Sequence, residues 1–145
     1  MKTTILCGIP GSGKTFSTQA GDTPTPIVSA DHYFIFNGEY RFDPSKLGEA
    51  HGQCLRYFIA RVRAGEDVIV DNTNTGVAEI APYMSIALAY GAEVEVKVFL
   101  ADPEVCAKRN THGVPLKACQ GMHARLLATL EAYPPFWAKP TIIKQ

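Results

Sequence analysis

A glycine-rich segment near the amino terminus constrains the fold of this chain more than any other feature. Residues 8–15 read Gly-Ile-Pro-Gly-Ser-Gly-Lys-Thr and fit the pattern G-x-x-x-x-G-K-[ST] at every position. The segment follows an apolar, β-branched run at residues 3–7 and precedes a predicted helix from Lys14 to Gln19. This order is typical of a phosphate-binding loop, because its glycines let backbone N–H groups turn toward phosphate oxygens and the helix adds its positive dipole end.

Each part of this loop has an expected task in binding a nucleotide. Lys14 should contact the β- and γ-phosphates and act in catalysis, and the Thr15 hydroxyl should bind Mg²⁺. The other residues predicted to bind the nucleotide are Gly8, Pro10, Gly11, Ser12 and Gly13. The motif therefore predicts ATP and Mg²⁺ as cofactors.

The rest of the chain alternates short apolar runs with longer segments of helical periodicity, which predicts one α/β domain over residues 1–145 with a parallel sheet. Strands are expected at residues 3–7, 26–29, 68–70, 94–100 and 141–143. Helices are expected at residues 14–19, 44–64, 78–90, 104–109 and 115–131. Between them, residues 32–42 are expected to form a long aromatic loop with a turn at Asn37-Gly38.

Composition limits the partners and the compartment. Lys plus Arg and Asp plus Glu are both 14, so overall charge does not indicate nucleic acid or membrane as a partner. The four cysteines are scattered, which favours reduced, buried thiols in the cytoplasm over a zinc site or a disulfide framework. The first apolar run stops at Gly8, too soon for a signal peptide or a membrane span. We therefore expect a soluble cytoplasmic protein without a membrane partner; its oligomeric state stays open.

Two aspartates follow predicted strands, where open α/β sheets bind ligands. Asp31 is the candidate general base for an attacking hydroxyl, the alternative being a cap of the next turn. Asp71 resembles a Walker-B carboxylate that holds Mg²⁺ directly or through water, the alternative being a partner for loop amides. Asn72 and Asn74 extend the polar rim and are candidate acceptor contacts.

A basic segment at residues 107–115, interrupted by Gly113, is predicted to be a short lid. Arg109 is the candidate that closes over the nucleotide and stabilises the transferring phosphate, because its planar guanidinium matches phosphate oxygens. Stabilising the helix end is the alternative. His112 in this lid and Arg41 in the aromatic loop are candidate acceptor contacts, and the aromatic side chains around Arg41 either stack on a base or pack internally.

Several of these segments together resemble small P-loop kinase domains of the polynucleotide 5′-hydroxyl kinase type, including the kinase-like domain of NEDD-binding proteins. The resemblance rests on residues 8–15, 29–31, 40–44 with 49–51, 70–74, and 109–114. It implies a P-loop NTPase sandwich with strand order 2-3-1-4-5 and helices on both faces, Asp31 as general base and Arg109 as lid arginine. The phage-type enzymes carry an arginine where this chain has Phe34, and another where it has His112.

The expected function is transfer of the γ-phosphoryl group of ATP to a hydroxyl of nucleic acid, at a 5′ end. A GTPase is not indicated, because the chain lacks an Asn/Thr-Lys-x-Asp sequence that would read guanine. Two alternatives stay open. One is a kinase for a modified DNA base or a small metabolite, and the other is a nucleotide-binding interaction module without transfer activity.

Overall fold

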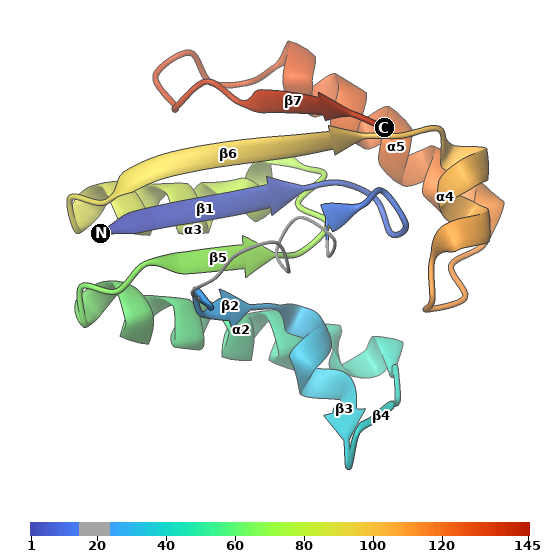
Figure 1. Ribbon diagram of the computed structural model, residues 1–145, viewed down its shortest axis with the longest axis horizontal. Coiled ribbons are helices and arrows are strands. Elements are labelled where there is room, and N and C mark those ends of the chain that lie inside the picture. The colour runs from blue at the N-terminus through green and yellow to red at the C-terminus, as the bar shows by residue number, and fades with distance from the viewer. Residues whose placement is uncertain (15–23) are drawn as a thin grey trace.

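Five parallel strands form the central sheet of the computed structural model, which describes residues 1–14 and 24–145 (Figure 1). In the order of the sheet, the strands are β2 (Ile27–Val28), β5 (Val68–Asp71), β1 (Lys2–Cys7), β6 (Glu93–Leu100) and β7 (Thr141–Lys144). Counted along the chain, the sheet order is 2-3-1-4-5. The predicted strands and their order are therefore confirmed.

Strand β1 lies at the centre of this sheet because its residues are apolar on both faces. Ile5, Leu6 and Cys7 are at most 2% exposed, as expected of a strand covered on both sides. Leu6 pairs with Asp71 of β5 on one side and with Lys97 of β6 on the other. This register places the segment that follows β1 beside the carboxyl end of β5.

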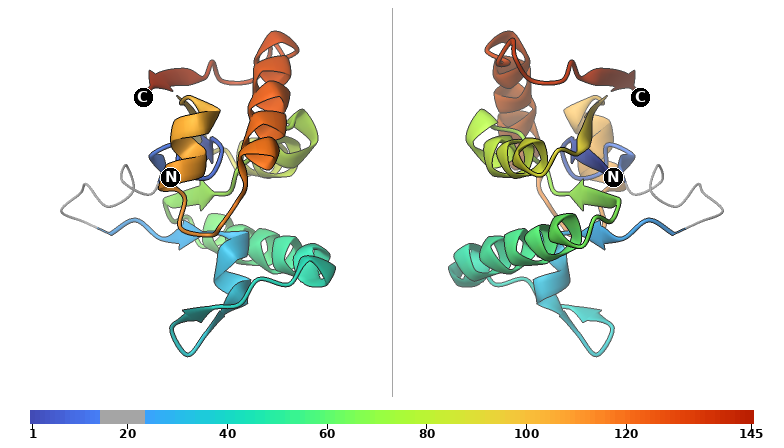
Figure 2. Two further views of the ribbon diagram at one scale, coloured as in Figure 1. Left: turned by 90° about the vertical axis from the view of Figure 1, so that its right-hand side faces the viewer. Right: turned by 90° about the vertical axis from the view of Figure 1, so that its left-hand side faces the viewer.

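Three long helices, α2 (Leu47–Arg63), α3 (Val77–Ala89) and α5 (Leu116–Glu131), cover one face of the sheet (Figure 2). The short helix α4 (Pro103–Arg109) stands at the edge where the strands end (Figure 1). Asp102 caps α4 by accepting a hydrogen bond from Glu104 N at 2.8 Å, and proline occupies the first helical position. The helix expected at residues 14–19 falls almost wholly outside the described residues.

The segment between β2 and α2 differs from the predicted loop. It contains the 3₁₀ turns η1 (Ala30–Phe34) and η2 (Pro44–Lys46), and a hairpin of β3 (Ile35–Phe36) and β4 (Glu39–Tyr40) that projects from the body (Figure 1). The hairpin turn is Asn37-Gly38, as predicted, and both residues have positive φ, 50° and 78°. This is the backbone geometry that two-residue hairpins favour. Prediction of a loop was wrong because the two strands are very short.

Two groups of buried side chains hold these elements together. The larger lies between the sheet and helices α2, α3 and α5, and includes Phe58, Met84 and Leu126. A smaller cluster joins the segment after β1 to β6, α4 and α5; its members are Ile9, Ala101, Cys106 and Cys119. All four cysteines of the chain are buried and free, which confirms that part of the prediction. In the described residues, we find no helix with the length and apolarity needed to cross a bilayer.

Candidate active site

The phosphate loop, residues 8–14, follows β1 and is shaped by glycines that side chains could not replace. Gly11 and Gly13 have φ of +83° and +98°, in the left-handed region that favours glycine. A Cβ atom on Gly11 would lie 2.4 Å from the carbonyl oxygen of Cys106 in α4. At Gly8 it would lie 2.6 Å from Ser12 Oγ. The loop therefore packs directly on α4 and has no room for a side chain at these positions.

The polar groups of this loop fit a bound phosphate. Ser12 is 1% exposed, and its Oγ is buried without a hydrogen-bond partner among the described residues. The ammonium group of Lys14 donates to the Gly8 carbonyl. Gly8 N–H donates to Thr73 O at 2.8 Å and Pro10 has no N–H, so these two shape the loop. Thr15, the predicted Mg²⁺ ligand, lies outside the described residues.

Lys14, Asp71 and Asp31 share one electrostatic environment at the carboxyl edge of the sheet. Burial lowers the pKa of Lys14, and the negative charges of Asp71 and Asp31 partly oppose that shift. Burial raises the pKa of Asp71, against the positive charge of Lys14. The three predicted residues therefore come together although they lie on separate segments of the chain.

Asp31 lies in the first turn of η1, just beyond the end of β2. Ser29, not Asp31, caps this turn, because its Oγ accepts a hydrogen bond from Asp31 N at 3.2 Å. The Asp31 carboxylate is consequently available for other contacts. Tyr40 donates its hydroxyl to Asp31 Oδ1 at 3.2 Å, and His112 Nδ1 lies 3.8 Å from Asp31 Oδ2. The Asp31 side chain nevertheless remains 53% exposed and can accept a further hydrogen bond.

The lid segment, residues 110–114, connects α4 to α5 and is folded around Asn110. The Asn110 amide donates to the carbonyls of Cys106, Ala107 and Val114, and its oxygen accepts from Val114 N at 2.8 Å. These bonds close the lid segment on itself and bring His112 to the Asp31 side of the site. In the left view of Figure 2, the segment after α4 descends toward η1 and the hairpin.

Arg109 is the last residue of α4 and is exposed. Its neighbour Asn110 lies against the phosphate loop, since a Cβ on Gly11 would be 3.1 Å from Asn110 N. Arg109 thus belongs to a helix that touches the phosphate loop. Its contact with the transferring phosphate stays a prediction.

Three predicted acceptor contacts have other partners. Asn72 accepts a hydrogen bond from Ala30 N at 2.9 Å and thereby ties β5 to η1. Asn74 is 2% exposed and donates to Leu6 O at 2.8 Å, with a positive φ of 45°. Arg41 pairs with Glu39 at 3.0 Å on the exposed hairpin. These contacts leave Asn74 buried under the edge of the sheet, away from an incoming acceptor.

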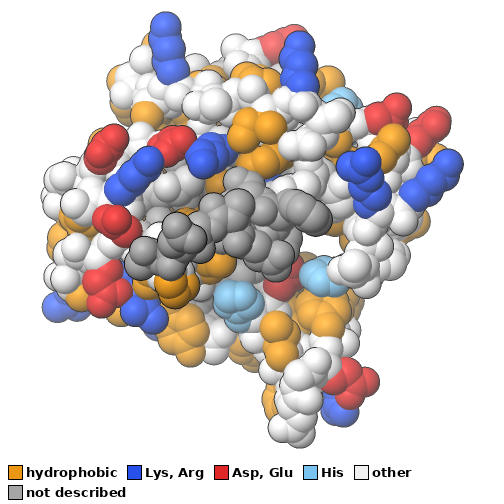
Figure 3. All heavy atoms as spheres, viewed as in Figure 1, with side chains coloured by type: hydrophobic (Ala, Val, Ile, Leu, Met, Phe, Trp, Pro, Cys, Tyr) orange, Lys and Arg blue, Asp and Glu red, His pale blue; other side chains and the backbone are white. Residues whose placement is uncertain are grey.

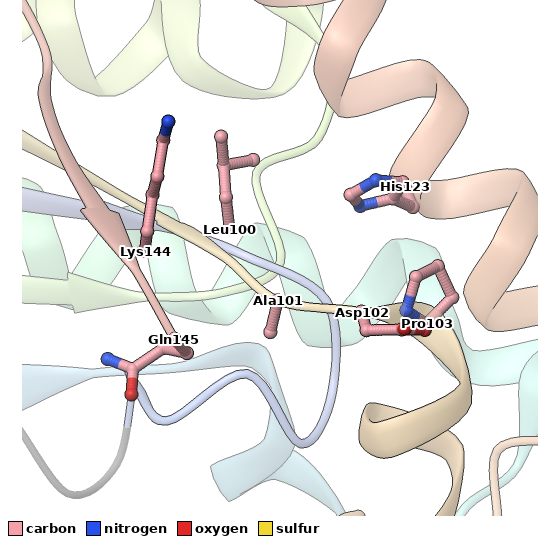
Figure 4. A pocket seen from close by; sticks show the side chains of 7 residues that line it. All are labelled: Leu100, Ala101, Asp102, Pro103, His123, Lys144 and Gln145. Carbon is pink, nitrogen blue, oxygen red and sulfur yellow. The ribbon is translucent and has the colours of Figure 1, made fainter.

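A hollow of about 450 Å³ opens beside the phosphate loop where β6 and β7 end (Figure 4). Residues of both strand ends, of the start of α4 and of α5 line it: Leu100, Ala101, Asp102, Pro103, His123, Lys144 and Gln145. Gln145 N donates to Leu100 O at 2.9 Å, and the Gln145 side chain would lie 3.5 Å from a Cβ on Gly13. Strand β7 thus brings a carboxamide to the loop.

Comparison with protein families agrees with this geometry. A family model described as an AAA domain matches residues 4–113, which is most of the chain. The chain belongs to the AAA domain family. Human NEDD4-binding protein 2 is 32% identical to this AAA domain over 154 residues, covering 96% of the chain. The chain spans 8% of the length of that relative.

Solved structures show which fold this AAA domain has. A chain in the Pnkp1/Rnl/Hen1 RNA repair complex superposes with a TM-score of 0.74 at 23% identity, covering 92% of this chain and 46% of that one. A sugar kinase from Janibacter sp. superposes with a TM-score of 0.61 at 21% identity, covering 99% of this chain and 85% of that one. The fold is therefore that of small P-loop kinases.

Two residues that organise the site of this AAA domain receive no role of their own from the sequence, although both lie in segments that carry the family resemblance. Tyr40 is one of them: its ring stacks on His112 with centroids 4.1 Å apart and planes 14° apart. Asn110 carries no motif of its own, although an asparagine just past a helix end and before Gly113 is typical of a side chain that organises a turn.

Proposed function

We propose that this AAA domain transfers the γ-phosphoryl group of ATP to a hydroxyl of nucleic acid, the 5′-hydroxyl of a polynucleotide. The observation that carries the proposal is the convergence of Lys14, Asp71 and Asp31: the charge of Asp31 acts on the pKa of both Lys14 and Asp71, which also act on each other. A module that only binds nucleotide needs Lys14 for the phosphates, but it does not need Asp31. A carboxylate at the acceptor side is what a transferase adds.

The phosphate loop and Lys14 hold the phosphates in this proposal. The buried Ser12 hydroxyl and the backbone around Gly11 and Gly13 line the cradle. Asp71, with Thr15, would hold Mg²⁺, which neutralises charge on the phosphate oxygens when bound. Arg109 would stabilise the charge that develops on the transferring group.

Asp31 orients the acceptor hydroxyl and takes its proton. Its carboxylate is half exposed, at the end of β2 and facing the lid segment, so an alcohol can reach it from solvent. Its charge raises the pKa of Lys14, which supports a role for this carboxylate beside the phosphate loop. In a loose transition state the proton of the attacking hydroxyl can leave late. Asp31 therefore acts by orienting this hydroxyl as well as by accepting its proton.

Nucleic acid is the proposed acceptor because the family resemblance and one of the fold likenesses support it. The family resemblance extends over segments on both sides of the site, and a structural neighbour is described as part of an RNA repair complex. The exposed aromatic side chains Phe36 and Phe42 lie on the hairpin segment beside Asp31, where a terminal base could stack.

A small alcohol such as a sugar is the second candidate acceptor. It is favoured by the neutral net charge and by the face in Figure 3, where basic and acidic side chains are interspersed. A nucleic acid would bind more tightly to a surface on which positive side chains are clustered. The likeness to a sugar kinase supports the same alternative.

The acceptor can be decided by incubating the chain with γ-labelled ATP, Mg²⁺ and a panel of hydroxyl compounds. The panel contains 5′-hydroxyl DNA and RNA oligonucleotides, nucleosides, DNA with hydroxylated bases, and sugars. We expect label on the 5′-hydroxyl oligonucleotides. Label on sugars or nucleosides alone would replace the polynucleotide proposal, and ATP binding without transfer to any acceptor would leave a binding module.

Asp31→Asn separates transfer from binding. The substitution keeps the size of the side chain but removes its charge, so single-turnover transfer should fall by about 10²- to 10⁴-fold while ATP affinity stays close to native. Asp67→Asn is the matched control, because Asp67 lies at the opposite end of β5, where it accepts a hydrogen bond from Lys2 N. Full transfer by Asp31→Asn would remove Asp31 from the mechanism.

A further inference from the structure

Tyr40 joins its own strand β4 to the neighbouring turn η1 and to the lid segment, which is far away in the sequence. It ends strand β4, donates its hydroxyl to Asp31 of η1 at 3.2 Å, and stacks on His112 of the lid segment. His112 in turn lies 3.8 Å from the second oxygen of the same carboxylate. The three side chains therefore form a closed set of contacts, with the Tyr40 hydroxyl bonded to one oxygen of the carboxylate and His112 close to the other.

The phenol of Tyr40 is suited to hold a carboxylate without competing for its proton. Burial, together with the charge and hydrogen bond of Asp31, raises the pKa of Tyr40 to about 12. The hydroxyl therefore stays protonated at any pH at which such a protein works. It acts as a fixed donor that keeps Asp31 Oδ1 occupied and leaves Oδ2 facing His112.

The ring of Tyr40 has its own support, independent of the hydroxyl. One ring face stacks on His112 with centroids 4.1 Å apart, while Phe34 packs edge-on at 6.2 Å. Phe34 is 3% exposed and belongs to the main core. The position of Tyr40 is consequently tied to the core on one side and to the lid segment on the other.

The position of the lid segment can affect the contact between Tyr40 and His112, because hydrogen bonds of Asn110 fix the shape of the segment. Asn110, the first residue of the segment, bonds to Cys106 of α4 and to Val114 at the far end of the segment, and its backbone N packs on Gly11 of the phosphate loop. A displacement of the lid segment would therefore move His112 away from Tyr40 and Asp31 together.

We propose that Tyr40 is a positioning residue of this AAA domain, which orients Asp31 through its hydroxyl and couples the lid segment to Asp31 through its stack on His112. The inference rests on the proposed function, because it assigns Tyr40 a role in the same phosphoryl transfer. The proposed coupling adds one point to that function: Asp31 is oriented toward the acceptor hydroxyl when the lid segment lies over the site.

Tyr40→Phe tests the hydroxyl alone, since the ring and its stack are kept. We expect kcat to fall about tenfold, as for loss of a hydrogen bond to a charged group at a half-exposed site, with KM for ATP unchanged. Tyr40→Leu also removes the stack and should lower kcat further. Tyr90→Phe is the matched control, because Tyr90 is an exposed tyrosine that follows α3, at the opposite edge of the sheet.

A double-mutant cycle tests the coupling through the lid segment. If Tyr40 and His112 act together, Tyr40→Leu and His112→Ala should lower kcat by less in combination than the product of their separate effects. Multiplying effects would show that the two residues act independently and would overturn the coupling. A native kcat in Tyr40→Phe would overturn the orienting role.

Proton NMR supplies a readout that needs no activity. His112 ring protons lie over the Tyr40 ring, so their resonances should be shifted upfield in the native chain and in Tyr40→Phe, and should lose that shift in Tyr40→Leu. Absence of the shift in the native chain would contradict the stack itself. A further outcome is an upfield shift of His112 in a native chain that transfers phosphate to no acceptor. That result would overturn the proposed function, and with it the role of Asp31 as a base that Tyr40 orients.

Discussion

The ammonium group of Lys14 donates to the carbonyl oxygen of Gly8, so the side chain folds back over the loop that begins with that glycine. This bond orients the lysine along the cradle, with Asp71 and Asp31 as the nearby negative charges. The positive charge of the lysine therefore already lies at the loop that would receive a phosphate.

Replacing Lys14 should show how much of ATP binding depends on that charge. We expect Lys14→Ala to weaken ATP binding by about a hundredfold, in line with the loss of charge-assisted hydrogen bonds, and to leave the fold intact. Equilibrium titration with a fluorescent ATP analogue measures it, with circular dichroism as the check on folding. Native affinity in this variant would contradict the assignment of the phosphate loop.

The pH dependence of ATP binding should report the environment of Lys14. Burial lowers its pKa, so the lysine should lose its proton, and the site its affinity, at a lower pH than an ordinary lysine with a pKa of 10.5. Lys14→Arg should bind ATP with an affinity that stays flat over the same range, because arginine keeps its charge up to about pH 12. Equal pH profiles for the two proteins would exclude Lys14 as the titrating group.

Arg109 should act on the transition state more than on bound ATP. Arg109→Ala is expected to lower kcat by about 10²- to 10³-fold, as for other groups that stabilise developing charge, with a smaller change in ATP affinity. Arg109→Lys should recover part of the loss, since a point charge lacks the planar fork. Steady-state kinetics with varied ATP distinguishes these cases, and a change in affinity alone would make Arg109 a ground-state clamp.

Asp71 should set the Mg²⁺ requirement. Asp71→Asn is expected to raise the Mg²⁺ concentration for half-maximal transfer by about ten- to a hundredfold, the range seen for groups that orient metal ligands. ATP binding without Mg²⁺ should not weaken, because a negative charge near the phosphates has been removed. An unchanged Mg²⁺ requirement would favour the alternative in which Asp71 serves the fold alone.

Gly11 offers a test of the contact between the phosphate loop and α4. Gly11→Ala places a Cβ 2.4 Å from Cys106 O in a residue with φ of +83°, so it should destabilise the fold by about 2–4 kcal/mol and abolish ATP binding. Gly65→Ala has the same backbone strain, with φ of +74°, but no atom within 4 Å, and should cost about 1 kcal/mol. Urea unfolding measures the free energy of unfolding of both variants. Equal losses of stability would show that α4 moves aside to make room for the added Cβ at Gly11.

The regular elements and the cradle could be predicted because each depends on local pattern. Parallel strands end at one edge, so a phosphate loop after β1 and aspartates at or just beyond the ends of β2 and β5 were expected at the same edge of the sheet, and the negative charges of Asp31 and Asp71 both act on the pKa of Lys14. Their roles in transfer remain predictions. The strand order came from the family resemblance, and it is confirmed.

The contacts between distant segments could not be predicted. Nothing local distinguishes Tyr40 from its aromatic neighbours, and its pairing with His112 depends on how the lid segment is folded by Asn110. The same limit applies to Asn74, which looks like a rim residue in sequence. Its backbone turns to φ of 45°, and its amide goes to Leu6 O beneath the sheet edge.

The β3–β4 hairpin can vary among related domains independently of the phosphate loop. Its strands hydrogen-bond to each other, its turn at Gly38 has open space around it, and Phe34 and Tyr40 anchor its base. The tip at residues 36–39 can therefore be lengthened or exchanged without touching the loop that holds the nucleotide. Grafting hairpin tips between relatives should alter which alcohols are accepted while the demand for ATP is inherited unchanged.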